Sequence, residues 1–477
     1  RIQAIFTSND TPLGECRMNT VLHNYFATGG KEHILFPHND PKSTQSISVI
    51  SKGDGFRVFD ENGKSYVDGV SALWCNTLGF SCDRLADAAY KQLKELPFYQ
   101  SSSYKTHPKL IEVAAKLLSI APPQMDKAIF ANSGSEANDT AIKLIWYYNN
   151  ARNRPEKKKI IGRVNGYHGV TVATASLTGI NYNHQSFDVP LDRFHHVMEP
   201  HFYRDGLPGE TEEEFSTRCA KELEDLILRE GADTFAAMWM EPVTGAGGVV
   251  APPRTYAEKM QEVLRRYDVL LVVDEVVCGY GRVGEYWGSQ AVGMTPDLMV
   301  TAKGLTSGYI PFSALLMSKE VADVINERAH EIGGFAHSLT YFGHPVGAAV
   351  ALETLNIYEE MDVVNHVRKL GKAMGDRLRE HFADHPLVGD VRCQGFLGAI
   401  ELASDKEARK GFDPKRKVAQ RLQAICEENG VILRAMNGDV IALCPPYIMT
   451  EDDVRAMVDT LALSVDQLAK ELEDGRL

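Results

Sequence analysis

This chain of 477 residues lacks closely spaced cysteine pairs and an excess of basic residues, and each absence argues against a class of protein. The eight cysteines are spread along the chain without a single C-x-x-C pair, so neither a zinc site nor a redox dithiol is suggested. We expect reduced thiols in a cytoplasmic protein. The 51 basic residues are outnumbered by 64 acidic ones, and this net charge of −13 argues against nucleic-acid binding through a basic face.

Long apolar runs, internal repeats and low-complexity segments are also missing. No apolar stretch approaches the roughly 18 residues of a membrane span, so we expect no membrane association. Residues 1–13 lack a positive region followed by an apolar stretch, so no signal peptide is expected. Hydrophobic residues make up 44% of the chain and charged residues 24%, which is typical of a globular protein.

Between about residues 110 and 318, short apolar runs alternate with amphipathic stretches. Six runs have the composition of buried strands: 128–132, 159–164, 235–240, 269–275, 298–302 and 312–317. Helical patterns at 136–152 and 255–268 lie between them. Continuous apolar strands that alternate with helices indicate a mostly parallel sheet covered on both faces, so the sequence predicts an α/β fold.

The two ends of the chain have other patterns. Residues 55–69 alternate apolar and polar side chains around Asn62-Gly63, which predicts a β-hairpin. Beyond about residue 340 the patterns predict long helices and short strands, at 345–360, 363–383, 391–403, 431–446 and 450–473. We therefore predict three parts, namely an N-terminal segment (1–70) that packs with the small domain, a large α/β domain (71–336) and a small α+β domain (337–477).

Two charged residues follow neighbouring runs of the predicted sheet. Asp274 lies at the end of the run 269–275, and Lys303 comes just after the next run. Charged residues at the C-terminal ends of parallel strands line the crevice where α/β proteins bind ligands, and neighbouring strands lie about 4.8 Å apart. An acid and an amine so placed can reach opposite ends of one planar ring, as pyridoxal phosphate requires. Taken alone, a helix cap explains Asp274 and a surface position explains Lys303.

A second motif offers a phosphate site. The run 128–132 is followed by Ser133-Gly134-Ser135 and then by the helical pattern 136–152. Free backbone N–H groups and the helix dipole make a helix N-terminus a binding site for phosphate. Gly134 permits close approach and both serine hydroxyls can donate, although an ordinary serine cap explains the same residues.

Two further segments carry weaker signals. Tyr167 lies between glycines after the run 159–164, where its ring can stack on a bound heterocycle, and a buried turn tyrosine is the alternative. Thr340 lies in a loop ahead of the predicted helix 345–360, and its hydroxyl can reach a phosphate.

Together and in this order, these segments resemble the class III family of pyridoxal-phosphate aminotransferases. The resemblance covers nearly the whole chain, from ALWCNTLGF (72–80) to the C-terminal strands, and the spacing of 29 residues from Asp274 to Lys303 fits the family. The segments GRVNGYHG, EPVTGAGGV and AKGLTSGYIP are most similar to the ω-amino acid or amine:pyruvate transaminases. The resemblance implies fold type I, similar to aspartate aminotransferase, and a homodimer with shared active sites.

The resemblance also implies which residues surround the cofactor ring. Lys303 binds the cofactor through its amine and then moves a proton during the reaction. Asp274 pairs with the ring nitrogen. Val276 packs on one face of the ring and Tyr167 on the other.

In the same family, other residues bind the phosphate and the substrate. The resemblance assigns the phosphate to Ser133, Gly134 and Ser135, and to Thr340 of the partner subunit. Trp74 would form a wall of the substrate pocket. Arg434 would bind a substrate carboxylate, for which a planar guanidinium is chemically suited, and a surface ion pair is its alternative explanation.

Three positions depart from the family's pattern. Relatives that use ornithine or 4-aminobutyrate carry a Glu in place of Ala246, which holds the arginine aside, and a Gln in place of Val277. The glutamate–arginine gate therefore cannot be carried over to this chain. Phe342 stands where a Ser is usual, which can reshape the pocket.

Other functions fit less well. Gly279, Gly281 and Gly284 form a G-x-G-x-x-G that suggests a nucleotide-binding oxidoreductase, but no proper helix follows it, and the acids Asp274 and Glu275 come before the glycines rather than about 20 residues after them. The histidines from His168 to His201 lack a metal-binding i, i+4 pair with a Glu, so we interpret them as structural. Racemases, decarboxylases and aminomutases of class III remain alternatives, whereas an inactive cofactor-binding protein would not be expected to keep Lys303 and Asp274.

The sequence therefore predicts a cytoplasmic, homodimeric aminotransferase with pyridoxal 5'-phosphate and without a metal. An amine or ω-amino acid would give its nitrogen to the cofactor, and pyruvate or a similar oxo acid would take it in a ping-pong reaction.

Overall fold

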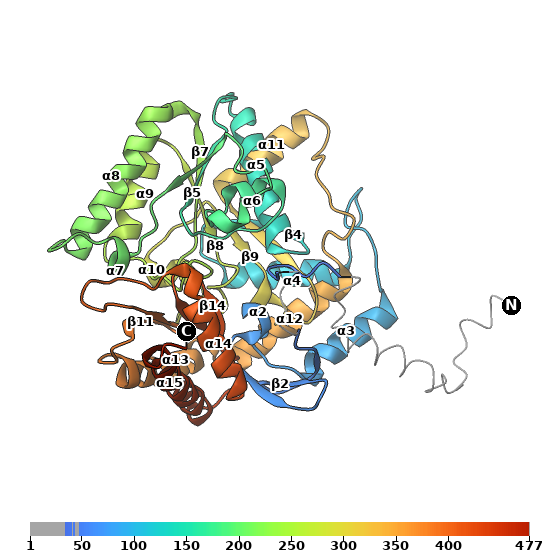
Figure 1. Cartoon of the computed structure of the whole chain (residues 1–477). Coiled ribbons are helices and arrows are strands. Elements are labelled where there is room, and N and C mark those ends of the chain that lie inside the picture. Colours follow the sequence, from blue (N-terminus) through green and yellow to red (C-terminus); the bar gives the residue numbers. More distant parts are fainter. Residues whose placement is uncertain (1–33, 41, 43–46, 477) are drawn as a thin grey trace, which may run out of the picture. The chain divides into compact units, whose positions relative to one another are not determined.

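The computed structural model describes residues 34–40, 42 and 47–476 (Figure 1). The chain divides into two compact units. One unit comprises Arg1–Gly53 and Val58–Tyr66, and the other comprises Asp54–Arg57 and Val67–Leu477. The predictions for residues 1–13 and for Cys16 lie outside the described residues.

The first unit carries most of three neighbouring strands, β1 (Ile50–Asp54), β2 (Arg57–Asp60) and β3 (Ser65–Asp68). In the turn between β2 and β3, the Asp60 N–H donates to the Lys64 carbonyl and the Gly63 N–H donates to the Asp60 carbonyl. Gly63 has a φ of +81°, a conformation that glycine adopts without strain. The predicted hairpin at Asn62-Gly63 is confirmed.

A sheet of seven strands forms the framework of the second unit. Its order is β4 (Met125–Ala131), β10 (Ser313–Ser318), β9 (Leu298–Thr301), β8 (Leu270–Asp274), β7 (Phe235–Met240), β5 (Lys159–Arg163) and β6 (Phe194–Val197). The strands from β9 to β6 run parallel, and β10 is antiparallel to both of its neighbours. All six predicted strands belong to this sheet, so the α/β fold with a mostly parallel sheet is confirmed.

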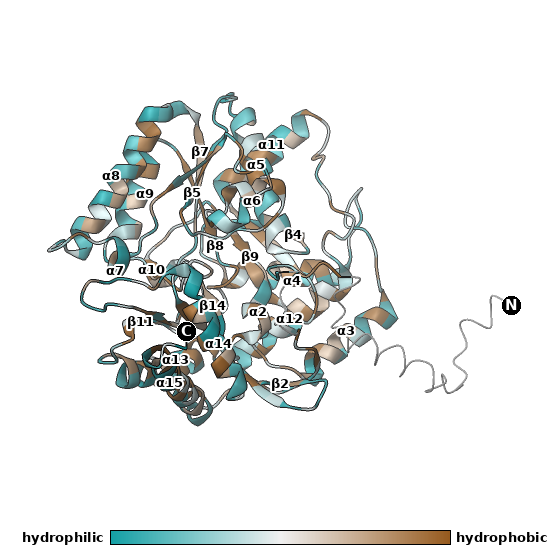
Figure 2. Cartoon of the chain, viewed as in Figure 1, coloured by the Kyte–Doolittle hydropathy of each residue, from teal (hydrophilic) through white to brown (hydrophobic). Residues whose placement is uncertain are grey.

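Helices cover both faces of this sheet, as the alternation of buried residues along β7 shows. Ala237 and Trp239 pack in one cluster with α5 (Gly134–Ala151) and α11 (Lys319–Glu331). Met238 and Met240 pack on the other face with two more helices, α8 (Glu212–Glu230) and α9 (Tyr256–Arg266). Every residue of β7 is therefore buried, and this explains its continuous apolar sequence. Figure 2 shows the matching stripes of hydrophobic and hydrophilic residues on the helices.

The C-terminal part of the second unit forms an antiparallel sheet. Its order is β11 (Val388–Gln394), β12 (Leu397–Leu402), β15 (Val440–Leu443) and β14 (Arg434–Met436). The helices that accompany it are α13 (Val363–Phe382), α14 (Val418–Glu428) and α15 (Glu451–Glu473). The short strand β13 (Val431–Ile432) pairs in parallel with Val67 and Asp68.

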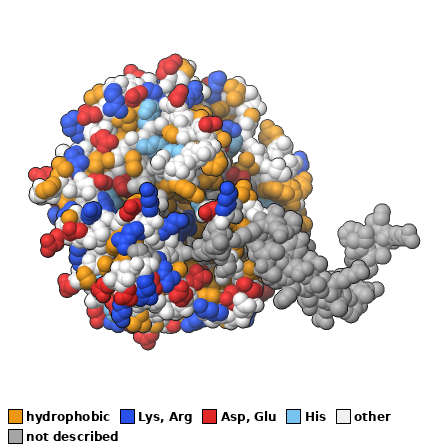
Figure 3. Space-filling view, in the orientation of Figure 1, with side chains coloured by type: hydrophobic (Ala, Val, Ile, Leu, Met, Phe, Trp, Pro, Cys, Tyr) orange, Lys and Arg blue, Asp and Glu red, His pale blue; other side chains and the backbone are white. Residues whose placement is uncertain are grey.

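The remaining helices join these parts. Three of them, α3 (Asp83–Glu95), α4 (Pro108–Ile120) and α12 (Pro345–Glu360), pack together. Short helices occur in the loops: α2 (Ser71–Trp74), α6 (Val172–Leu177), α7 (Phe202–Asp205) and α10 (Gly288–Val292). No helix among the described residues is long and apolar enough to span a membrane. Acidic and basic side chains are intermixed over the face shown in Figure 3. The domain boundaries at residues 70 and 336 stay predictions, since the second unit contains both sheets.

Candidate active site

Asp274 is the last residue of β8 and is 4% exposed. Its Oδ2 accepts a hydrogen bond from Asn138 Nδ2 at 2.9 Å and lies 2.9 Å from His168 Nδ1. Its Oδ1 accepts only one backbone bond, from the Val276 N–H at 3.1 Å. A carboxylate oxygen can accept more than one bond, so Oδ1 can take a further proton donor such as a protonated ring nitrogen.

Lys303 follows β9, the strand next to β8, and the register pairs Asp274 with Val300. The two residues therefore come from adjacent strand ends at the same edge of the sheet, as the sequence predicted. Lys303 begins a 3₁₀ turn (Lys303–Leu305) with a φ of +43°, a left-handed conformation that costs an L-residue about 1 kcal/mol. Burial lowers the pKa of Lys303, although the nearby Asp274 opposes the shift. A buried amine with a lowered pKa is suited to act as a nucleophile or a base.

Trp74 lies close to both Lys303 and Arg434. The centre of its indole ring lies 5.4 Å from Lys303 Nζ and 5.7 Å from Arg434 Cζ. Ser71, at the start of the same short helix α2, holds this segment in place because its hydroxyl donates to the Cys444 carbonyl at 2.7 Å. Trp74 is 5% exposed. One buried ring thus contacts both cationic side chains that the sequence assigned to the site.

Tyr167 and Arg434 complete this group. Arg434 begins β14, and burial lowers its pKa, with the nearby Tyr167 working in the opposite direction. Burial raises the pKa of the Tyr167 phenol, while Arg434 opposes that shift and Asp274 adds to it. The charges of Asp274 and Arg434 therefore both act on the pKa of the Tyr167 phenol.

The predicted phosphate site lies at the start of α5. The helix begins at Gly134, two residues earlier than its pattern indicated, with Ser133 as its N-cap. Ser133 Oγ accepts from the Glu136 N–H at 3.2 Å and still has a proton to donate. Ser135 Oγ accepts from the Val170 N–H at 3.2 Å, which ties the helix to the loop that carries Tyr167. Ser133 occupies the Glu136 N–H, but the first N–H groups of a helix have no partner within the helix, so those of Gly134 and Ser135 are available to a phosphate.

Gly134 also faces Val276. A Cβ atom at position 134 would lie 3.2 Å from Val276 Cγ2, tighter than ordinary contact. A larger residue at either position would therefore close the space between the helix start and the strand end. The start of α5, the buried Asp274 and the amine of Lys303 suit the phosphate, the ring nitrogen and the aldehyde of pyridoxal phosphate. Thr340 is exposed on the loop before α12.

Three buried residues that the sequence did not assign support the site. Asn138 donates to Asp274 and to the His168 carbonyl, while its own Oδ1 accepts from Trp239 Nε1 at 2.8 Å. His168, interpreted from sequence as structural, lies against Asp274 instead. Its place directly after Tyr167 in GYHG was the signal that could have found it.

Glu241 is the third of these residues and follows β7. It is 5% exposed and accepts from the Tyr167 N–H at 3.1 Å and the Gly245 N–H at 2.9 Å. Burial raises the pKa of Glu241, and the nearby His168 opposes this. Glu241 thus fixes the backbone of two loops that border the site.

The rival sites receive no support from the geometry. Gly279, Gly281 and Gly284 lie in the turns between β8 and the five-residue helix α10, so no helix of useful length follows them. A Rossmann phosphate site requires a helix at that point. Among the described residues, no group of three or more His, Cys, Asp or Glu could hold a metal ion.

An amine and a buried carboxylate on adjacent strand ends, beside a helix start suited to phosphate, define a pyridoxal-phosphate enzyme of fold type I. The model of the class III aminotransferases matches residues 39–465, and the chain belongs to this family. It is therefore a pyridoxal-phosphate-dependent transaminase, which moves an amino group from an amine to an oxo acid.

Similar proteins agree with this assignment. The chain is 45% identical to a protein of Solanum lycopersicum named as a mitochondrial gamma aminobutyrate transaminase 1, over 89% of this chain and 82% of that one. The solved omega transaminase from Pseudomonas jessenii in complex with PMP is 45% identical, with a TM-score of 0.91, and the match covers 93% and 98% of the two chains. A solved transaminase with L-alanine is 52% identical, with a TM-score of 0.87, over 89% and 100%.

Proposed function

We propose that this transaminase uses pyruvate as its amino acceptor and that Arg434 binds the pyruvate carboxylate. The observation that carries the proposal is that Arg434 and Lys303 both contact the ring of Trp74. A carboxylate paired with Arg434 is thereby held near the reactive amine. The likeness to a transaminase solved with L-alanine, the amino acid that pyruvate yields, supports the same acceptor.

The chemistry follows from the residues of the site. Bound pyridoxal phosphate supplies an electron sink for the electron pair left when the substrate Cα loses its proton. Lys303 moves that proton, and the lowered pKa of its buried amine suits it to this task. Asp274 keeps the ring nitrogen protonated, and its own position is fixed by Asn138. Tyr167 and Val276 would orient the ring between them.

The donor is proposed to be an amine or an ω-amino acid. Trp74 forms the wall of the pocket, and a flat indole suits an apolar or aromatic donor. Position 246 is an alanine and not a Glu that could pair with Arg434, so the arginine stacks on the Trp74 ring instead. A donor with a distal carboxylate would pair with Arg434, and a simple amine would leave it stacked.

We also propose a homodimer in which Thr340 of the partner subunit completes the phosphate site. Thr340 and the neighbouring Tyr341 are exposed, and the Tyr341 ring lies 5.6 Å from that of Phe98 in an edge-on contact. Tyr104, in the loop after Phe98, is fully exposed as well. Exposed aromatic side chains in a group mark an interaction surface, and a second copy would cover this one.

Co-expression tests the shared site. Lys303→Ala and Thr340→Val each damage one half of a shared site, so each variant alone should be inactive or weak. A mixed dimer contains one site in which both residues are intact. Random pairing should then restore about a quarter of the normal activity. No recovery in mixtures that form dimers would contradict a shared site.

The function itself is tested with a panel of amine donors against pyruvate, with alanine as the measured product. We expect alanine from arylalkyl amines and from ω-amino acids. Racemisation or decarboxylation of single amino acids without an oxo acid would favour the alternative class III reactions instead.

The cytoplasmic location is also kept as a proposal. The described cysteines are all free, which supports a reducing compartment. Fractionation of cells that make the protein tests it, because recovery with organelles would contradict a cytoplasmic enzyme.

A further inference from the structure

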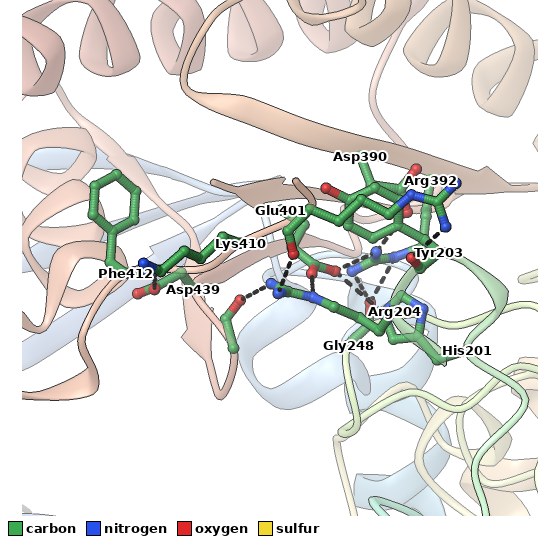
Figure 4. Close-up of polar contacts among 12 residues, drawn as sticks. His201, Tyr203, Arg204, Gly248, Asp390, Arg392, Glu401, Lys410, Phe412 and Asp439 are labelled. Carbon is green, nitrogen blue, oxygen red and sulfur yellow. Dashed lines mark hydrogen bonds and ion pairs between the residues drawn. The ribbon is translucent and has the colours of Figure 1, made fainter. Parts of the chain in front are cut away.

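A buried ion-pair cluster joins the antiparallel sheet to the segment around α7 (Figure 4). At its centre Glu401 of β12 is 1% exposed and accepts hydrogen bonds from Arg204 Nε and, at 2.5 Å, from Arg392 Nη1. His201 Nε2 lies 3.2 Å from the same carboxylate. One buried carboxylate therefore holds groups from two distant parts of the chain.

Arg392 of β11 extends this cluster toward the active site. Its Nε and Nη2 donate to the carbonyl oxygen of Gly248 at 3.1 and 2.8 Å. Its Nη1 is shared between Glu401 and Asp390, the latter at 2.7 Å. The side chain is 11% exposed. A planar guanidinium fixed by two carboxylates thus clamps one backbone carbonyl with two parallel hydrogen bonds.

The clamped carbonyl belongs to a tight loop that borders the substrate site. The N–H groups of Gly248 and Val249 both donate to the Gly245 carbonyl, at 3.0 and 3.1 Å. The Gly245 N–H in turn donates to Glu241. A Cβ at position 245 would lie only 2.8 Å from Trp74 Cζ3, so the loop backbone rests directly on the indole.

We infer that Arg392, held by Glu401, is a positioning residue for the substrate pocket. It holds the 244–249 loop against Trp74 and so sets the distance between this wall and the reactive amine. This inference rests on the proposed substrate role of Trp74. Among the described residues, the side chain of Arg392 bonds to Gly248, Asp390 and Glu401 and to neither Lys303 nor Asp274, so its loss should loosen substrate binding more than it slows the proton transfer.

The test measures the loop itself and then catalysis. Amide hydrogen exchange of the holoenzyme and of the cofactor-free protein is followed in peptides that cover residues 242–250. Arg392→Met removes both hydrogen bonds to Gly248, so exchange there should rise about tenfold or more. Arg392→Lys keeps a positive charge beside Glu401 and one hydrogen-bond donor for the Gly248 carbonyl, so it should restore part of the protection against exchange.

The matched control is Arg421→Met in α14. Arg421 also makes a bidentate ion pair with a carboxylate, to Glu471 at 2.7 and 2.8 Å, but at α15 rather than at the loop. This control should leave exchange in 242–250 unchanged. If Arg392→Met fails to fold, Glu401→Gln gives the same comparison, since it frees Arg392 from one of its two carboxylates.

Kinetics separate positioning from simple loss of stability. For Arg392→Met, the KM of the amine donor should rise about tenfold while kcat stays within about twofold. Unchanged exchange in 242–250, or a rise equal to that of the control, would overturn the inference. A fall in kcat with an unchanged KM would overturn it as well. The exchange result needs no substrate, so it stays informative even if pyruvate proves not to be the acceptor.

Discussion

His168 Nδ1 lies 2.9 Å from Asp274 Oδ2, and both side chains are buried. The imidazole and Asn138 therefore both hold the same oxygen of the carboxylate that would pair with the cofactor's ring nitrogen. This arrangement leaves the other oxygen, Oδ1, for the ring nitrogen. The histidine, the asparagine and the aspartate form one unit, and substitutions within the unit should not act independently.

Asp274→Asn should keep the cofactor and its colour but lose most of the transamination. An amide cannot hold a proton on the ring nitrogen, so the electron sink is lost. Removal of one partner from a buried charge pair costs about 3–5 kcal/mol, which lowers rates by orders of magnitude. Single-turnover kinetics followed by absorbance measure this. Near-normal rates would show that Asp274 serves only as a structural acceptor.

His168→Phe should slow the same step by less, because Asn138 and the Val276 N–H still hold the carboxylate. The double variant with Asp274→Asn should be no slower than Asp274→Asn alone, since both changes act through one carboxylate. The double-mutant cycle is the measurement. Additive losses would mean that His168 acts elsewhere.

Arg434→Ala should affect one half-reaction more than the other. Pyruvate has a carboxylate that pairs with the guanidinium, and a simple amine has none. Loss of a charge-assisted contact is worth about 1.5–3 kcal/mol, or about ten- to a hundredfold in the pyruvate requirement. The amine half-reaction should change little. Separate single-turnover measurements of each half test this, and equal losses in both would indicate a structural arginine.

Acid should weaken the fold through Glu401. Burial alone would raise the pKa of this carboxyl, but His201, Arg392 and Arg204 together lower it to about 2, against an ordinary value of 4.5. A lowered pKa means that the stabilisation is complete above 4.5 and is lost as the pH falls from 4.5 toward 2. The loss amounts to about 3 kcal/mol. The free energy of unfolding, measured at several pH values, should fall less between pH 4.5 and 2 for Glu401→Gln than for the natural protein. An equal fall in both proteins would contradict this role.

The sequence predicted the parts of the molecule that local patterns encode. Asp274 and Lys303 end or follow strands buried on both faces, and such strands have continuous apolar sequences. The strand β6 (Phe194–Val197) was missed because its four residues include two histidines and its pattern is too short to stand out.

The supporting residues of the site were missed for a different reason. Asn138 and Glu241 contact Asp274 and Tyr167 only after the helix α5 and the strand β7 have packed into the sheet. The first of these contacts joins residues 136 positions apart in the chain, and the second joins residues 74 positions apart. No local pattern carries such a long-range partner, so its identification needs the fold.

The most direct test of the account concerns Lys303. The purified protein with pyridoxal phosphate should be yellow, and reduction with borohydride should fix the cofactor on one peptide, the one that contains Lys303. Lys303→Ala should fold normally, because the residue lies at a strand end, yet show neither the visible band nor turnover. A colourless natural protein, or fixation of the cofactor on another lysine, would contradict the account.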